Sequence, residues 1–351
     1  MRLLITGASG FLGGELVRQA VSRGVRVKAL VRRGSAPRGV ETERADLADE
    51  AGLAAAVQGV DQVIHAAGLA HVTNPRAALA NSFFDVNKRG TANVVRAAAR
   101  AGVSHFVLVS SVAVYGEGDE ARTEASACVP SGPYAQSKWQ AELRALEIAH
   151  KHGMRLTILR LATLYGEGDP GNVARLMRWI DRGRFFWIGD GSNMKSLVHR
   201  DDAARACLAA LEAPGGGTSI YNVSAAPCTM RSVVEGLATT LGRNLPRWRI
   251  PGSLAQGVAD VAGRLPGRAG RVRAMAGSVR KWLSNDVYSA DKLRTATGFE
   301  PSVSLDEGLL REAAWYRDSG LDWTPTIALG APPLRMDVSA VKSTGRVRRA
   351  S

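Results

Sequence analysis

A tyrosine and a lysine four positions apart, Tyr134 and Lys138, have the spacing that points most directly to chemistry. On a helix, positions i and i+4 share a face, so the ammonium would lie beside the phenol. A neighbouring cation favours the phenolate, and we expect it to lower the pKa of Tyr134 from its usual value of about 10. Such a phenol can exchange a proton with an alcohol or ketone while a nicotinamide cofactor carries the hydride. We therefore predict that Tyr134 and Lys138 are catalytic.

Ser111 is the third residue that we assign to this chemistry. It lies 23 residues before Tyr134, at the end of an apolar run that is typical of a strand. There its hydroxyl can hydrogen-bond the substrate oxygen with which Tyr134 exchanges a proton. We expect Ser111 both to take part in catalysis and to contact the substrate.

A glycine-rich loop with the spacing GxxGxxG follows the first predicted strand and opens the first predicted helix. Gly7 permits the tight turn, Gly10 lets the backbone approach a pyrophosphate at the helix N-terminus, and Gly13 lets helix and strand pack closely. Placed between a strand and a helix, this pattern predicts a dinucleotide-binding site. The contacts that we expect in the loop are Gly7, Gly10, Phe11, Leu12 and Gly13.

The end of the second predicted strand indicates which dinucleotide binds. An acidic residue there would bind the adenosine ribose of NAD, whereas an arginine accommodates the 2′-phosphate of NADP. The strand ends in Arg32 and Arg33 with no acid, so we predict NADP(H) in preference to NAD(H); the alternative is that both arginines are simply solvated. We expect His65 to be a packed residue rather than a catalyst. Further cofactor contacts are expected after the third and fourth strands, at Asp46, Leu47, Ala66, Ala67 and Gly68.

The predicted catalytic and cofactor-binding residues lie at the ends of strands and the N-termini of helices. Strands and helices alternate along the chain. Apolar runs followed by helical patterns indicate βαβ units and a parallel sheet. We predict an α/β fold, a Rossmann-type doubly wound parallel sheet with a smaller C-terminal substrate-binding lobe. Strands are expected over 2–6, 25–31, 41–46, 62–66, 105–110, 155–161 and 219–223, and helices over 11–23, 50–58, 85–101, 133–152, 173–182, 201–212 and 230–241.

The same pattern divides the chain into parts. We assign 1–165 to an NAD(P)-binding Rossmann domain, to which later segments at about 196–225 return. Residues 166–323 form mainly the substrate-binding lobe. The stretch 324–351 contains three prolines and then polar and basic residues, and we predict that it is a disordered basic tail.

Composition limits the class of protein. The 351 residues are 45% apolar and 22% charged, which is globular and excludes wholesale disorder. The three cysteines are far apart and form no CxxC pair, so we expect packing residues in a reducing cytoplasm. We find neither a signal peptide nor a run of about 18 apolar residues that could span a membrane.

The net charge of +14 is unevenly distributed. Residues 243–281 carry nine basic side chains against one acidic, and 335–351 carry five against one. The rest of the chain is near neutral, which argues against a nucleic-acid partner. The segment 243–281 has two interpretations: a lid helix with solvated arginines, or a contact with an anionic membrane that would place the protein at the inner face.

The sequence resembles the extended short-chain dehydrogenase/reductase family, of the NAD-dependent epimerase/dehydratase kind, over roughly residues 1–320. The resemblance rests on TGASGFLG (6–13), HAAG (65–68), VSSVAVYG (109–116), PYAQSK (133–138) and ILRLATLYG (158–166). It implies that Ser111, rather than Ser110, is the catalytic hydroxyl, and that helices 85–101 and 133–152 form a homodimer. It further implies cofactor contacts at Asn87, Tyr134, Lys138 and Leu161, and substrate contacts at Ser111, Thr163, Lys195 and Arg200.

Departures from the family pattern reduce the number of activities within the family that the sequence fits. The 4,6-dehydratases have Asp-Glu directly after the catalytic hydroxyl, where this chain has Val112 and Ala113, so elimination of water lacks its acid and base. Nucleotide-sugar 4-epimerases usually have Asn at the position of Thr163 and Arg at that of Lys195, and their Arg-Pro-Gly phosphate clamp is not found near 279–285. The basic segment 249–283 instead resembles that of 3β-hydroxysteroid-dehydrogenase-like and hopanoid- or glycan-associated members.

We therefore predict an NAD(P)-dependent epimerase or oxidoreductase that moves a hydride at a sugar carbon, C4, of a nucleotide-linked sugar, with Tyr134 as acid and base and no metal. One alternative is a 3β-hydroxysteroid-dehydrogenase-like enzyme for a steroid or terpenoid alcohol or ketone. Another is a non-catalytic NADP-binding regulator. The intact set of Ser111, Tyr134 and Lys138 argues against the regulator, since a sensor needs no proton relay.

Overall fold

The computed structural model describes residues 1–37, 39–70, 81–255, 257 and 277–319. The predicted tail at 324–351 and the part of the basic segment between 258 and 276 lie outside the described residues. Among the described residues, no helix is both long and apolar enough to cross a membrane.

A seven-stranded sheet forms the centre of the larger part of the fold, and neighbouring strands all pair in parallel. Its strand order is β11-β6-β5-β4-β1-β2-β3, which reverses direction at β1 and confirms the predicted doubly wound topology. The carboxyl ends of β1 and β4 therefore lie side by side, where ligands bind in such sheets. The strands are β1 (Arg2–Thr6), β2 (Arg26–Val31), β3 (Glu41–Arg44), β4 (Gln62–His65), β5 (His105–Ser111), β6 (Arg155–Leu161) and β11 (Thr218–Val223).

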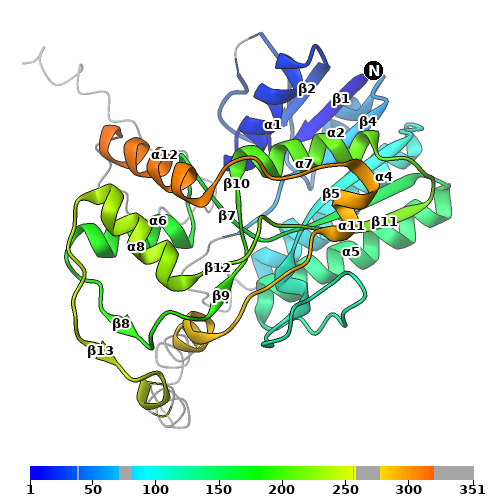
Figure 1. Cartoon of the computed structure of the whole chain (residues 1–351). Coiled ribbons are helices and arrows are strands. Elements are labelled where there is room, and N and C mark those ends of the chain that lie inside the picture. Colours follow the sequence, from blue (N-terminus) through cyan, green and yellow to red (C-terminus); the bar gives the residue numbers. More distant parts are fainter. Residues whose placement is uncertain (38, 71–80, 256, 258–276, 320–351) are drawn as a thin grey trace, which may run out of the picture.

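Helices cover both faces of this sheet (Figure 1). Along β1, Leu3 and Ile5 pack in the hydrophobic cluster that contains α1 and α7, whereas Leu4 packs in the cluster that contains α2, α4 and α5. The two layers follow from this alternation, because successive side chains of a strand face opposite sides. The helices are α1 (Phe11–Ser22), α2 (Glu50–Val57), α4 (Thr91–Arg100), α5 (Gly132–His152) and α7 (Arg200–Glu212).

The segment predicted as one helix over 85–101 has two parts. A π-helical turn, η1 (Phe84–Gly90), precedes α4 and packs against α5. Such turns recur at functional sites. Here the turn carries Asn87, which is buried.

A smaller lobe holds most of the second half of the chain. In Figure 1 its helices α6 (Asn172–Asp181), α8 (Met230–Leu241) and α12 (Leu305–Asp318) lie to one side of the main sheet and pack together through a separate hydrophobic cluster. Short strand pairs extend the lobe, and α11 (Asp291–Thr297) packs back on β11 and α7. The pairs are β7 (Thr163–Tyr165) with β10 (Leu197–His199), β9 (Met194–Lys195) with β12 (Cys228–Thr229), and β8 (Trp187–Ile188) with β13 (Arg249–Ile250).

Candidate active site

Tyr134 and Lys138 lie on the first turns of α5, which begins with Gly132 and has Pro133 in its first turn. Proline there needs no backbone donor and has the φ angle that a helix requires. The Lys138 ammonium donates to the carbonyl of Val109 on β5 at 2.6 Å, so the helix is tied to the strand beside it.

Ser111 ends β5 and brings the third predicted group to the same place. Its hydroxyl hydrogen-bonds the Tyr134 side chain and also accepts from the Ala113 amide at 3.2 Å. The second bond caps the 3-10 helix η2 (Val112–Tyr115) and fixes the serine side chain. The structure therefore brings Ser111, Tyr134 and Lys138 together, as the sequence predicts.

The protonation of this group differs from the expectation in one respect. Burial raises the pKa of Tyr134 above its usual value, and the hydrogen bond from Ser111 only partly opposes this. Burial also lowers the pKa of Lys138 to about 8, against the opposing effect of the Glu142 carboxylate. The predicted lowering of the Tyr134 pKa is therefore wrong for the polypeptide alone, because removal of the phenolate from water dominates.

The glycine loop lies against the end of β4. Gly7 has a φ of +70°, and a Cβ there would lie 2.7 Å from the Ala67 amide nitrogen. A Cβ on Gly13 would lie 2.0 Å from the Gly7 carbonyl oxygen, so α1 can approach the loop only with glycine at this position. The Gly10 amide donates to the Gly7 carbonyl at 2.8 Å and closes the turn.

The start of α1 is suited to an anionic group. Its N-cap residue, Gly10, supplies no side-chain cap, and its first turn has no acidic residue. The amide groups of this turn can therefore bind the pyrophosphate of a dinucleotide, assisted by the helix dipole. Phe11 is half-buried and Leu12 is buried at this turn. The loop thus fits the dinucleotide that its sequence predicts.

His65 at the end of β4 is a packed residue, as expected. Its two ring nitrogens lie 2.7 Å from the Thr6 hydroxyl and 3.0 Å from the Thr91 hydroxyl. Burial and the nearby Lys138 charge lower its pKa to about 3, so it is neutral at physiological pH. Thr6 also accepts from the Ala67 amide at 3.2 Å, which fixes the small-residue segment after β4.

Asn87 holds the next part of that segment. Its side-chain oxygen accepts from the Leu69 amide at 2.7 Å, and its amide group donates to the Leu69 carbonyl at 3.0 Å and to Ser137 on α5 at 2.9 Å. A Cβ on Gly68 would lie 3.2 Å from the Asn87 oxygen and 3.9 Å from the Lys138 nitrogen. Asn87 therefore fixes the chain beside Lys138.

Arg32 and Arg33 follow β2 on the exposed side of the glycine loop. Arg32 lies 3.9 Å from Asp46, and both side chains are about half exposed. The Arg33 carbonyl accepts from the Ser9 hydroxyl at 3.4 Å, so this turn borders the glycine loop. Leu47 packs on Gly90, where a Cβ would lie 2.8 Å from its side chain.

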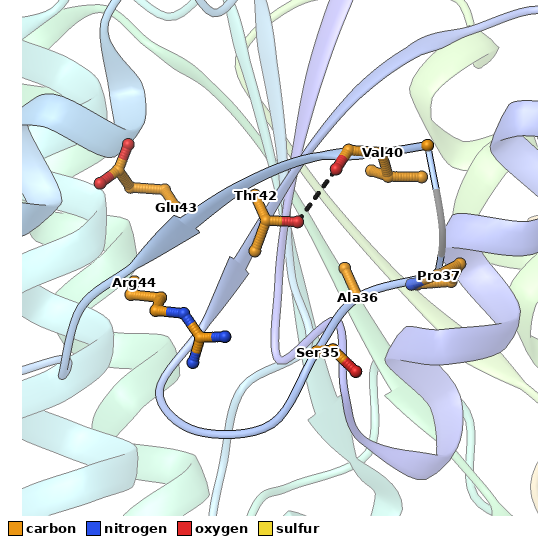
Figure 2. A pocket seen from close by; sticks show the side chains of 8 residues that line it. Ser35, Ala36, Pro37, Val40, Thr42, Glu43 and Arg44 are labelled. Atoms are coloured by element: carbon orange, nitrogen blue, oxygen red, sulfur yellow. Dashed lines mark hydrogen bonds between the residues drawn. The ribbon is translucent and has the colours of Figure 1, made fainter.

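An open hollow of about 460 Å³ lies on the loop that joins β2 to β3 (Figure 2). Thr42 in its wall donates to the Val40 carbonyl at 3.0 Å. The hollow borders the turn that follows Arg33 and stands apart from Tyr134. It is lined by Ser35, Ala36, Pro37, Gly39, Val40, Thr42, Glu43 and Arg44.

Two of the predicted substrate contacts have internal partners instead. The Lys195 ammonium donates to the carbonyls of Lys281 and Ser284 and to the Asp286 carboxylate at 2.7–2.8 Å, which uses its three hydrogens. Arg200 pairs with Glu167 and lies over the Phe11 ring. Both cations therefore have partners within the polypeptide, and their predicted contacts with the substrate stay predictions.

Leu161 and Thr163, which the family resemblance also assigns to the ligands, lie where the chain passes from the main sheet to the small lobe. Leu161 is buried at the end of β6, opposite Ser111 in the sheet register. Thr163 begins β7, where it pairs with Leu197 and remains half-buried. Both positions agree with the predicted path of the chain, and their contacts with ligands stay predictions.

Sequence reasoning missed a buried charged network behind the catalytic residues. Glu142, one turn after Lys138, pairs with Arg160 on β6 at 2.8 Å and accepts from the Ser110 hydroxyl. The Arg160 guanidinium also lies 4.8 Å from the centre of the Tyr115 ring. The signal was an arginine within the apolar strand 155–161 and a glutamate on the helix face of Lys138.

A second ionic cluster was also missed. His199, Glu167 and Asp201 place ligand-type atoms within 4.8 Å of one another. The Arg311 guanidinium on α12 pairs with Glu167 at 2.7 Å and with Asp201 at 2.6 Å, and Arg200 lies beside them. Because two arginines balance the carboxylates, the arrangement is an ion-pair network that joins α12 to the start of α7.

Comparison with known proteins agrees with this site. A sequence model described as the NAD dependent epimerase/dehydratase family matches residues 3–224. The chain is 30% identical to the N-acetyl-alpha-D-glucosaminyl-diphospho-ditrans,octacis-undecaprenol 4-epimerase of Escherichia coli O157:H7, over 88% of this chain and 93% of that protein. It is 31% identical to the 2-alkyl-3-oxoalkanoate reductase of Stenotrophomonas maltophilia strain K279a, over 89% and 98%.

A solved structure extends the likeness to the fold. MoeE5, in complex with UDP-glucose and NAD, superposes with a TM-score of 0.73 at 26% identity and covers 91% of this chain and 99% of its own. The family match spans well over half of the chain and includes the glycine loop, Ser111, Tyr134 and Lys138. The chain is therefore an enzyme of the NAD-dependent epimerase/dehydratase family, within the extended short-chain dehydrogenases/reductases.

Proposed function

We propose that this enzyme is an NAD(P)-dependent 4-epimerase of a diphosphate-linked sugar, most simply a nucleotide-linked one. The observation that carries the proposal is the cluster of Ser111, Tyr134 and Lys138 at the end of β5, beside the glycine loop. The epimerase from Escherichia coli and MoeE5 support it, because both are associated by name with a sugar on a diphosphate.

Each residue of the cluster has a separate role in this reaction. Tyr134 removes the proton of the C4 hydroxyl and later returns it, while Ser111 donates a hydrogen bond to the same oxygen. Lys138, held by the Val109 carbonyl, supplies positive charge that favours the phenolate form of Tyr134, which is the form that accepts the proton. A nicotinamide cofactor, when bound, supplies hydride acceptance and return. The amides at the start of α1 bind its pyrophosphate.

The cluster also argues against dehydration. Elimination of water from a sugar needs a carboxyl acid and base next to the catalytic hydroxyl. Val112 is buried at this position and has no carboxyl group. Ala113 has only a methyl side chain, and its backbone amide already donates to the Ser111 hydroxyl. We therefore infer that the oxidised sugar would take the hydride back from the reduced cofactor without losing water.

A second candidate is a 3β-hydroxysteroid-dehydrogenase-like enzyme, which reduces a steroid or terpenoid ketone or oxidises the corresponding alcohol. Two observations favour it: Lys195 and Arg200 are bound internally, and one relative is named a 2-alkyl-3-oxoalkanoate reductase. The third candidate, a non-catalytic regulator, would leave the Ser–Tyr–Lys cluster without a role.

The cofactor of the purified enzyme separates these candidates. An epimerase recycles its own hydride, so we expect tightly bound cofactor after dialysis and interconversion of UDP-sugar C4 epimers without net oxidation. Exchangeable cofactor that is consumed in proportion to product would contradict epimerisation and support the reductase. Absence of turnover with both substrate classes, despite cofactor binding, would support the regulator.

Three further properties are part of this proposal. NADP(H) is preferred to NAD(H), because Arg32 and Arg33 border the glycine loop and can bind a 2′-phosphate. A homodimer forms through α5 and the helices at 84–100. The α5 residue Leu143 is 45% exposed, so it offers an apolar contact for a second copy. The cytoplasm is the location that suits three free cysteines.

A further inference from the structure

The end of the small lobe carries large apolar side chains that face solvent. Phe186 and Trp248 stack on each other with ring centres 6.1 Å apart and planes 6° apart. Trp248 is 60% exposed, Phe186 36%, and nearby in sequence Leu254 is 59% exposed. A monomeric soluble protein gains nothing by exposing a stacked aromatic pair, so the pair indicates an interaction surface.

The backbone brings three basic segments together around this pair. Strands β8 and β13 pair in parallel, and the Gly189 amide donates to the Ile250 carbonyl at 2.9 Å. The Trp282 indole donates to the Ile188 carbonyl at 3.0 Å, which adds the segment before Ser284. In Figure 1, β8 and β13 lie at the end of the lobe remote from the main sheet.

These three segments have a single sign of charge. Residues 182–189, 243–255 and 277–284 contain no aspartate or glutamate. Their basic side chains are Arg182, Arg184, Arg243, Arg247, Arg249, Arg280 and Lys281. Arg243 pairs with Asp181 at 3.1 Å, whereas Arg184, Arg247 and Arg249 flank the aromatic pair in sequence and are exposed.

We propose that this end of the lobe docks on an anionic phospholipid membrane. We define the tip surface as Arg184, Phe186, Arg247, Trp248, Arg249 and Leu254. Tryptophan and other amphipathic rings partition to the headgroup level of a bilayer, and arginines beside them are attracted by anionic lipids.

Docking at the tip surface reaches beyond the proposed chemistry. The described residues contain no spanning helix, so this attachment is peripheral and depends on charge together with shallow apolar burial. An electrostatic attachment must weaken with salt, because the Debye length falls from about 10 Å at 0.1 M to about 3 Å at 1 M.

Vesicle co-sedimentation of the full chain tests the proposal. Vesicles of phosphatidylglycerol and phosphatidylcholine should bind the protein at low salt, and vesicles of phosphatidylcholine alone should not. We expect Arg184→Gln, Arg247→Gln and Arg249→Gln together to weaken binding roughly a hundredfold, since each basic residue contributes about fivefold. Phe186→Ser with Trp248→Ser should also weaken binding and should reduce the part that survives high salt.

A matched control removes the same charge elsewhere. Arg23, Arg26 and Arg100 are exposed on the nucleotide-binding half, and their triple change to Gln should leave vesicle binding unchanged. Equal loss in the control and tip variants would overturn the proposal, because net charge alone would then explain binding. So would absence of binding at low salt, or tighter binding of a single-stranded oligonucleotide than of vesicles. None of these outcomes depends on turnover, so the proposed epimerase activity is tested separately.

Discussion

The Glu142 carboxylate and the Arg160 guanidinium meet 2.8 Å apart, and their side chains are 0% and 2% exposed. The pair connects the catalytic helix α5 to β6. Through the Ser110 hydroxyl it also reaches β5, directly before Ser111. A buried ion pair therefore lies behind the catalytic residues and connects α5 and β5, the two elements that carry them, to the neighbouring β6.

Breaking this pair should destabilise the protein strongly. Glu142→Ala leaves the Arg160 charge buried without its partner, which costs about 3–5 kcal/mol of unfolding free energy. The double change Glu142→Leu with Arg160→Met should recover most of that loss, because it removes both charges and keeps the volume. Urea denaturation measures both. A loss below about 1 kcal/mol for Glu142→Ala would show that water or another group compensates the arginine.

Tyr134→Phe should abolish turnover and leave cofactor binding intact. The change removes one hydroxyl and keeps the ring, and loss of a general acid–base group costs roughly 10²–10⁴-fold in rate. Tyr316→Phe is the matched control, since its hydroxyl bonds Asp181 at 3.0 Å in the small lobe. Steady-state rates and cofactor titration give the two readouts. A Tyr134→Phe enzyme that keeps more than about a tenth of the rate would end the assignment.

Two adjacent glycines should respond differently to alanine. A Cβ on Gly13 would lie 2.0 Å from the Gly7 carbonyl, whereas one on Gly14 would lie 3.7 Å from the Ala8 carbonyl. We expect Gly13→Ala to cost at least about 1–3 kcal/mol and to impair cofactor binding, because the loop must move. Gly14→Ala should be neutral or stabilise by about 0.5–1 kcal/mol. Thermal unfolding and cofactor affinity should rank the two variants in this order.

The arginines after β2 should determine the choice of cofactor. Arg32→Ala with Arg33→Ala is expected to weaken NADPH binding far more than NADH binding, because only NADPH carries the 2′-phosphate. Arg23→Ala with Arg26→Ala removes equal charge from the same half of the protein and should affect neither. Fluorescence titration of both cofactors provides the affinities. Equal losses for NADPH and NADH, or a wild-type preference for NADH, would mean that the two arginines are only solvated.

Because two buried histidines are neutral in the folded protein, we expect the free energy of unfolding to fall as the pH is lowered. Burial lowers the pKa of His65 to about 3 and that of His105 to about 4, and Lys138 and Arg155 respectively add to the effect. Below the unfolded value of about 6.5 the unfolded chain binds more protons, so stability is present above that pH and is lost towards the folded values. Each histidine should cost about 2 kcal/mol at pH 5.

The measurement is urea unfolding at pH 7.5 and pH 5. His105→Gln should remove about 2 kcal/mol from the difference between the two pH values, because glutamine does not titrate and can still bond Thr157. An unchanged difference in the variant would show that His105 is already protonated in the folded protein.

Most of the sheet could be predicted from the sequence, because its strands, apart from the polar edge strand β3, are rich in apolar residues and bounded by loop residues. The helix expected at 230–241 occurs as Met230–Leu241, and that expected at 173–182 as Asn172–Asp181. The π-turn at Phe84–Gly90 could not be foreseen, since its pattern of apolar residues is that of an ordinary helix. It depends on a tertiary contact, the bonds from Asn87 to Leu69.

In the site too, some features follow from local sequence and others from contacts between distant segments. Tyr134 and Lys138 were predictable because helix periodicity places them on one face, and Ser111 because it ends a strand and matches the family's motif. The partners of Lys195 come from residues 281–286, about ninety positions later, and no local pattern specifies that approach. The pKa of Tyr134 likewise depends on how deeply the folded chain covers the phenol.

The pairing of β11 with β6 has a consequence for how the chain is made. All six residues of β11 pair with β6, from Thr218 with Leu156 to Val223 with Leu161. A nascent chain that has emerged only to β6 therefore presents an apolar strand with an unpaired edge, and α1 still lacks α7 against its inner face. Until about residue 223 has left the ribosome, the edge of β6 in the main sheet stays unpaired, and a strand of another chain can pair with it.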